Sequence, residues 1–170
     1  DGHAWSKVET GVSAVLFGVW GSGADDVYAV GELGLVLHYN GLGWTTVDTG
    51  TQFEFWGAWG TSPHDVFFFS DADGVLHFDG QHFRQANISS RQSFNYGMGV
   101  NSIDLFTMEY EGQGLLHFNG TDWGIVSVPP VTNFSIWATR AKTYLGGRQG
   151  SIVTFDRHCA SRETHCFDRW

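Results

Sequence analysis

Three histidines recur in this chain at a nearly constant spacing, and histidine is the residue type that most often binds metals or moves protons. They are His38, His77 and His117, which stand 39 and 40 residues apart. Three imidazoles would suit a zinc ion. The spacing puts each one in a separate repeat, however, so we expect the three side chains to lie far apart. We therefore predict a repeated packing or hydrogen-bonding role for them, with no metal site and no cofactor.

Aspartates form a second recurring set, in what we expect to be turns. They are Asp26, Asp65 and Asp104, and Asp25 stands beside the first of them. Carboxylates in turns commonly accept hydrogen bonds from nearby backbone N–H groups. A pair such as Asp25 and Asp26 would also suit Ca²⁺ or glycosidase chemistry, but proximity in sequence does not make two carboxylates converge. Asp26, Asp65 and Asp104 are therefore candidates for ligand binding beside a structural role in the turn.

Tryptophans make the third set, at Trp20, Trp59 and Trp137. Each is expected to end the innermost strand of its repeat. One interpretation is that they form the core between repeats. The other is that some of them reach the surface and stack on sugar rings. We take these three tryptophans as candidate ligand-binding residues.

The elements that position these residues occur four times. The stretch Gly18 to Gly31 returns with a period of 39, although Met98 replaces the tryptophan of the third copy. Asn-Gly or Asp-Gly opens the second, third and fourth copies, and both dipeptides favour tight hairpins. A fixed period near 40 residues is typical of propeller blades. We divide the chain into repeats 1–40, 41–79, 80–119 and 120–156, followed by a tail over 157–170.

Each repeat reads as four short strands rich in β-branched and aromatic residues, bounded by Gly, Asp or Asn. This pattern predicts an all-β fold, a β-propeller of four blades. The chain opens with an expected fourth strand, Trp5 to Glu9, and the last copy stops after its third, Ile152 to Phe155. The N-terminal strand is therefore expected to complete the last blade and close the ring. The alternative is a larger ring, completed by further sequence or by a second chain.

Composition narrows the possible partners. The net charge is −9, whereas nucleic-acid binding depends on Lys and Arg that neutralise phosphates. The same charge has the wrong sign for an anionic membrane surface. The longest apolar run is far shorter than the roughly 18 residues of a membrane span. We expect neither a nucleic-acid partner nor membrane insertion.

The pattern that runs from Leu16 to Trp44, and returns from Gly57 to Phe83, resembles tandem propeller repeats of secreted bacterial proteins, notably those of myxobacteria. These are similar to Asp-box propellers and to propellers of the photosystem-assembly-factor type. The resemblance implies a propeller that serves binding or assembly, without naming a ligand. Sialidases also use Asp-box propellers, but they need an arginine cluster, and the first two copies hold no arginine. We exclude that class of enzyme.

The tail and three Asn-X-Ser/Thr sites add further expectations. Cys159 and Cys166 are predicted to form a disulfide; a zinc site with the nearby histidines and free thiols are the alternatives. The chain begins at Asp1, as a processed product or an excised piece would, so it could have lost a signal peptide. Asn87, Asn119 and Asn133 begin possible N-glycosylation sites, all expected in loops or turns.

Together these observations predict a secreted or periplasmic, non-enzymatic binding module. Its partner is expected to be a carbohydrate or a protein, bound in lectin-like fashion by the turn loops at 21–26, 60–65, 99–104 and 138–142. A structural subunit of a homo- or hetero-oligomer is the alternative. An enzyme would need an irregular polar cluster, for which the third and fourth copies hold the only candidates: Glu109, Glu111, Arg140, Lys142 and Arg148.

Overall fold

The computed structural model describes residues 4–72, 74–88, 93–109, 114–128 and 133–156. Within them the chain forms four antiparallel sheets, each strand pairing with the next along the sequence. Sheet A holds β1 (Leu16–Gly23), β2 (Asp26–Gly31), β3 (Val36–Tyr39) and β4 (Trp44–Val47). Sheet B holds β5 (Phe55–Ser62), β6 (Asp65–Ser70), β7 (Val75–Phe78) and β8 (Phe83–Gln85).

Sheets C and D continue the pattern. Sheet C holds β9 (Phe94–Asn101), β10 (Asp104–Glu109), β11 (Leu115–Phe118) and β12 (Trp123–Val126). Sheet D holds β13 (Asn133–Ala138), β14 (Lys142–Gly147) and β15 (Ile152–Asp156), so it has three strands among the described residues. The all-β prediction is confirmed, and the described residues form four antiparallel sheets. Closure into a four-blade ring is not seen.

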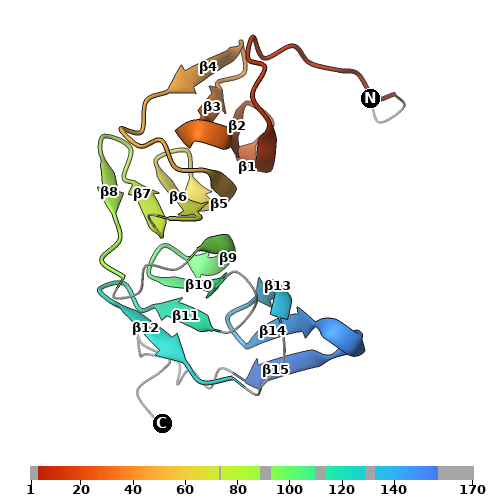
Figure 1. The fold of residues 1–170 in the computed structure, drawn as a ribbon, viewed down its shortest axis with the longest axis vertical. Coiled ribbons are helices and arrows are strands. Elements are labelled where there is room, and N and C mark those ends of the chain that lie inside the picture. The colour runs from red at the N-terminus through yellow and green to blue at the C-terminus, as the bar shows by residue number, and fades with distance from the viewer. Residues whose placement is uncertain (1–3, 73, 89–92, 110–113, 129–132, 157–170) are drawn as a thin grey trace.

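The four sheets follow one another along an arc, with sheet A at one end and sheet D at the other (Figure 1). The first strands β1, β5, β9 and β13 contact one another in that order. Residues 4–10, where a closing strand was predicted, form no strand, and Trp5 is fully exposed. That prediction is wrong for a single chain, because the N-terminal segment leaves sheet A at the end of the arc remote from sheet D.

Apolar clusters fill the three gaps between neighbouring sheets. Side chains alternate along each strand, so Phe68 faces sheet A while Phe67 and Phe69 face sheet C. The second strands of sheets B and C therefore supply residues to both neighbours and are almost wholly buried. This alternation explains why the central strands read as continuous runs of apolar residues.

The connections between second and third strands are tight as well. In sheet A the turn Glu32–Gly34 holds Leu33 at φ 55°, and in sheet D the turn Arg148–Gly150 holds Gln149 at φ 58°. Gly34 and Gly150 follow with φ of 74° and 70°, values that favour glycine. These turns lie at the end of the sheets opposite the hairpins that join first and second strands, because the strands alternate in direction.

Of the three glycosylation sites, Asn87 and Asn119 lie outside strands and are exposed. Asn133 is the first residue of β13, so its placement in a loop was wrong. Cys159, Cys166 and the rest of the tail lie outside the described residues. No helix among the described residues is long and apolar enough to cross a membrane.

Candidate functional site

The recurring aspartates and histidines form pairs, one in each of the first three sheets. Nε2 of His38 lies 2.6 Å from Oδ1 of Asp26. The same two atoms are 2.7 Å apart in His77 and Asp65, and 2.9 Å apart in His117 and Asp104. Each aspartate opens the second strand of its sheet and each histidine stands on the third. The pair therefore joins the hairpin turn to the middle of the blade.

An aromatic ring of the second strand holds each histidine from the side. Tyr28 stacks on His38 with ring centroids 4.3 Å apart, and Phe67 stacks on His77 at 4.1 Å. Phe106 lies 4.6 Å from His117. The histidines are thus fixed by a carboxylate at one edge and a ring on one face. This arrangement agrees with the predicted packing and hydrogen-bonding role.

A β-bulge at the end of the first strand adds a third group to the pair. Ser22 and Thr61 occupy the extra position in the register between first and second strands. The Ser22 hydroxyl donates to Oδ2 of Asp26 over 2.5 Å, and the Thr61 hydroxyl donates to Oδ2 of Asp65. Val100 stands at the matching place in sheet C and has no hydroxyl to donate.

These contacts set the charge state of the first turn. Burial acts to raise the pKa of Asp26, but the hydrogen bonds from Ser22 and His38 outweigh it and hold the pKa below its ordinary value of 3.8. Burial and the nearby charge of Asp26 raise the pKa of Tyr28 to about 12. The geometry thus engages Asp26, Asp65 and Asp104, predicted as ligand-binding residues, in hydrogen bonds inside their own sheets.

The tryptophans lie between sheets. A Cβ built on Gly60 would come within 2.8 Å of the Trp20 ring, and one on Gly99 within 2.5 Å of the Trp59 ring. Each ring therefore covers a glycine of the next sheet along the arc. Trp137 stands at the end of the arc and is 53% exposed. The geometry favours packing for Trp20 and Trp59, and leaves Trp137 as the accessible member of the set.

The turn loops are shorter than expected. The first strand runs on to Gly23 and the second begins at Asp26, so the turn itself is Ala24 and Asp25. In sheets B and C the turns are 63–64 and 102–103. The tip residue beside the paired aspartate differs in each sheet: Asp25, His64 and Ile103, all exposed.

A second turn, between the third and fourth strands, lies against the first. A Cβ on Gly41 would meet Cβ of Asp25, while those on Gly80 and Gly120 would meet His64 and Ile103. The hydrogen bonds inside this second turn are also the same in all three sheets. Oδ1 of Asn40 accepts from the N–H groups of Leu42 and Gly43, and Asp79 and Asn119 do the same in their turns.

A glycine follows the Asn or Asp in each of these turns. These glycines, Gly41, Gly80 and Gly120, have φ between 87° and 94°, where a side chain is strained. The tips again differ, as Leu42, Gln81 and Thr121. We use the name turn face for the six tips on this side of the arc, namely Asp25, Leu42, His64, Gln81, Ile103 and Thr121. Asp25, His64 and Ile103 lie in the loops 21–26, 60–65 and 99–104, where binding was expected, but sequence reasoning did not single out Leu42, Gln81 and Thr121.

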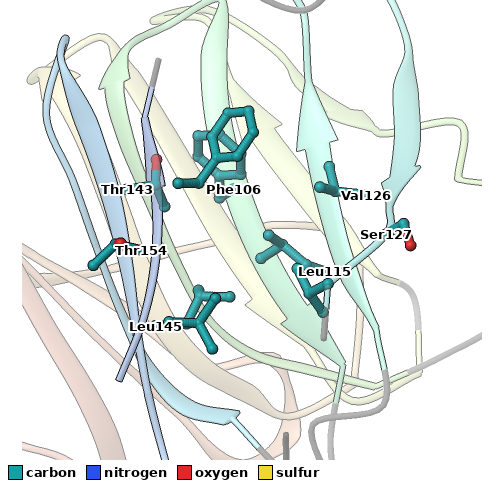
Figure 2. Close-up of a pocket in the computed structure, with 10 residues that line it drawn as sticks. Phe106, Leu115, Val126, Ser127, Thr143, Leu145 and Thr154 are labelled. Carbon is teal, nitrogen blue, oxygen red and sulfur yellow. The ribbon is translucent and has the colours of Figure 1, made fainter. Parts of the chain in front are cut away.

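An apolar cavity of about 240 Å³ lies between sheets C and D. Figure 2 shows Phe106 and Leu115 of sheet C on one side of it, with Thr143 and Leu145 of sheet D on the other. Val153, Thr154 and Phe155 of β15 complete the sheet D side. The two other gaps between sheets receive a large aromatic side chain from a fourth strand, Phe83 in one and Trp123 in the other.

Among the polar residues considered for an enzyme, Lys142 and Glu109 lie on opposite sides of the arc. Lys142 stands at the hairpin side of sheet D, where its Nζ lies 3.1 Å from Oδ1 of Asp156. Glu109 ends β10 on the opposite side, and burial raises its pKa. Glu111 lies outside the described residues. Among the described residues, no group of three or more His, Cys, Asp and Glu side chains could hold a metal ion.

The fold is that of β-propeller proteins. No protein family matches this sequence, and neither does any curated protein. Solved structures do match in three dimensions. A structure of YCF48 bound to a D1 peptide covers 90% of this chain and 55% of its own, with 12% identity and a TM-score of 0.66. The β-propeller domain of Cps50 (Swd1) from Myceliophteria thermophila covers 83% and 53%, with 10% identity and a TM-score of 0.61.

A computationally designed protein, Ika4, is similar over 89% of this chain and 99% of its own, with 8% identity and a TM-score of 0.70. The present chain thus spans about half the length of the YCF48 and Swd1 chains that it resembles. At these identities the likeness establishes the fold.

Proposed function

We propose that this chain is a non-enzymatic binding module whose turn face receives a protein or peptide partner. One observation carries the proposal: the turns repeat their internal hydrogen bonds from sheet to sheet but change their exposed tips. Asp26, Asp65 and Asp104 are held inside the blades, whereas the residue before each of them is acidic, imidazole-bearing or apolar in turn. Proteins commonly present binding residues in this way, on variable loop tips held by a rigid framework.

The chemistry of the tips favours a protein over a glycan. Leu42 is 94% exposed and Ile103 is 43% exposed. Apolar anchors of this kind gain affinity when they enter pockets of a protein partner. Stacking on sugars would instead require open aromatic rings, and Trp20 and Trp59 lie over glycines of the next sheet. That YCF48 has been solved with a bound D1 peptide is further support for a peptide partner.

A similar argument applies to location and to the other partners. The secreted or periplasmic location stays our proposal on the resemblance to secreted repeats. The tips of the turn face are one carboxylate, one imidazole and four uncharged side chains, so they form no basic patch. The chain as a whole also has an excess of acidic residues. Nucleic acid is therefore a poor fit for the turn face.

The test is to pan a phage-displayed random peptide library on the purified chain and to measure the affinity of a selected peptide by fluorescence anisotropy. The triple variant Leu42→Ala, His64→Ala, Ile103→Ala should weaken binding at least tenfold, or about 1.4 kcal/mol. Leu33→Ala is the matched control, because Leu33 is 76% exposed on the opposite side of sheet A.

Equal loss of affinity in the triple variant and the control would refute the turn face as the site. A glycan array run on the same sample separates the two partner classes. Saturable binding to one sugar class, with no peptide selected, would overturn the protein partner and restore the lectin hypothesis.

A further inference from the structure

The two ends of the arc carry complementary halves of the contact that joins neighbouring sheets. Between internal sheets, a tryptophan of the innermost strand covers a glycine of the next sheet, as Trp59 covers Gly99. The first residue of each of the third strands β3, β7 and β11 is buried in the same gap: Val36 and Val75 are 0% exposed and Leu115 is 3% exposed. Both features can be followed along the repeats to the two ends.

Sheet D presents one half of this contact to solvent. Trp137 corresponds to Trp59 and is 53% exposed. Ile152 corresponds to Val36 and Val75 and is 72% exposed. Positions that are buried or half-buried in the internal gaps are therefore uncovered here.

Sheet A presents the other half. Gly21 corresponds to Gly60 and Gly99, but the atoms nearest to a Cβ built on it belong to its own sheet, with no aromatic ring among them. Val19 precedes it by two residues and is 69% exposed, whereas its counterpart Ala58 packs in the cluster between sheets A and B. Sheet A thus has an uncovered glycine, Gly21, at the position where Gly60 and Gly99 are covered by a tryptophan of the preceding sheet.

In the part of the chain that the structure describes, sheet D ends at β15 and has no fourth strand. In sheets A, B and C the fourth strand begins with an aromatic residue that meets the last aromatic residue of the third strand. The centroid distances are 5.4 Å for Tyr39 and Trp44, 4.8 Å for Phe78 and Phe83, and 5.2 Å for Phe118 and Trp123. The counterpart in sheet D, Phe155, lines the cavity of Figure 2.

The N-terminal segment has the sequence of that strand. Trp5-Ser6-Lys7-Val8 matches Trp44-Thr45-Thr46-Val47 and Trp123-Gly124-Ile125-Val126, with tryptophan first and valine fourth. Trp5 is 104% exposed and Val8 is 61% exposed. Each fourth strand in the chain leads directly into the first strand of the next sheet, as β4 leads into β5. Residues 5–8 lead into β1 in the same way.

We propose that two copies of this chain close into one ring, each laying sheet D against sheet A of the other and receiving the other's residues 5–8 as a fourth strand. Trp137 then covers Gly21 of the other copy, and Trp5 fills the cavity between sheets C and D. A second copy fits because both ends differ and match one another. Two head-to-tail junctions close by a two-fold rotation and leave no open end.

The size of the arc agrees with two copies. The four sheets form an open arc (Figure 1) and span about half of the YCF48 and Swd1 chains. Among the described residues β15 is the outermost strand of sheet D, and closure pairs its outer edge with residues 5–8. The residues named for these junctions are not among the six tips of the turn face, so the inference goes beyond the proposed function and does not depend on it.

The experiment is sedimentation equilibrium of the 170-residue chain over a dilution series. The expected result is a reversible equilibrium between one chain of 18.9 kDa and two. Ile152→Asp should raise the dissociation constant about 100-fold, because it places an unpaired carboxylate in the junction. Ile125→Asp is the matched control: Ile125 is 80% exposed on β12, away from both ends, and should leave the constant unchanged.

Trp5→Ala, at a fully exposed residue of the single chain, should also weaken the pair without changing the far-UV circular dichroism. A single-chain mass at every concentration would overturn the proposal, and so would a trimer or an open series of larger species. Equal effects of Ile152→Asp and Ile125→Asp would do the same. Because the dilution series of the unaltered chain needs no variant, a misfolded mutant leaves the test intact. Loss of peptide binding with the two-chain mass retained would refute only the proposed function.

Discussion

Asp25 and Asp26 are neighbours in sequence, and we expect their replacement to have opposite consequences. Asp26 is 14% exposed in its side chain and accepts hydrogen bonds from Ser22 at 2.5 Å and His38 at 2.6 Å. A hydrogen bond to a charged group contributes about 1.5–3 kcal/mol, and the two share one carboxylate near solvent. Asp26→Ala should therefore lower the free energy of unfolding by about 2–3 kcal/mol.

Asp25→Ala should change the free energy of unfolding by less than about 0.5 kcal/mol, as is usual for an exposed residue. Asp25 is exposed, and its atom nearest to a Cβ built on Gly41 is its own Cβ, which alanine keeps. The measurement is urea unfolding at pH 7, followed by tryptophan fluorescence, with all variants at one protein concentration because any association would add to the apparent stability.

The pH dependence gives a second readout with a defined sign. The pKa of Asp26 is lowered in the folded chain, so its contribution is fully present above the ordinary value of 3.8 and is lost as the pH falls through the folded pKa. The gap between the parent chain and Asp26→Ala should narrow below about pH 4, whereas Asp25→Ala should follow the parent throughout. Equal costs for the two variants, or a gap that widens on acidification, would refute the assignment of Asp26 to the framework.

Three further predictions concern the gaps between sheets. Tyr28 donates from its hydroxyl to the carbonyl of Pro63 over 3.0 Å; Tyr28→Phe should cost about 1 kcal/mol and remove the loss of stability expected as the pH rises from the ordinary Tyr pKa of 10.0 to about 12, measured by urea unfolding across that range. Gly97→Ala should cost about 1–3 kcal/mol, because a Cβ there collides with the Phe69 ring; adding Phe69→Leu should recover part of this, and strictly additive costs in the double-variant cycle would contradict the contact. Thr107 is fully buried and donates to the carbonyl of Tyr96 over 3.0 Å, so Thr107→Val should lower the melting temperature by the equivalent of about 1 kcal/mol, and an unchanged melting temperature would speak against this hydrogen bond.

The strands were predictable from the sequence because each is short, apolar and bounded by a turn signal. The expected strand Ile152 to Phe155, for example, lies within β15. The expected loop at 21–26 was too long, since a bulge at Ser22 lets β1 continue to Gly23. A bulge changes the register without leaving a distinctive residue type, so spacing alone did not show it.

The pairing of aspartate with histidine was missed, although the sequence held a signal for it. Both residue types were expected to have structural roles, but separately. In the fourth copy, Lys142 replaces the aspartate and Thr154 replaces the histidine, so the two disappear together. Their joint loss is what a direct contact produces, because either residue alone would leave a half-buried polar group without its partner.

Closure depends on a quantity that local sequence does not encode. The residues that pack one sheet on the next set the angle between sheets, and that angle decides how many sheets complete a turn. The same Trp and Gly positions serve any number of blades, so the period revealed the blade and not the ring. The exposure of Trp137 and Ile152 indicates that a further sheet packs against this end of the arc, because their counterparts in the other repeats lie between two sheets.

The separation of constant from variable residues also bears on where function resides. The first three repeats keep the residues that hold their turns in place: the Asp–His pair, the Asn or Asp that starts the second turn and the glycine after it. The tip residues differ between sheets, as His64 and Ile103 do, so no contact common to the blades depends on their side chains. Chemistry that is identical in every copy is therefore the least informative about the ligand, and the six differing tips of the turn face are the residues whose replacement should change what the protein binds while the blades stay folded.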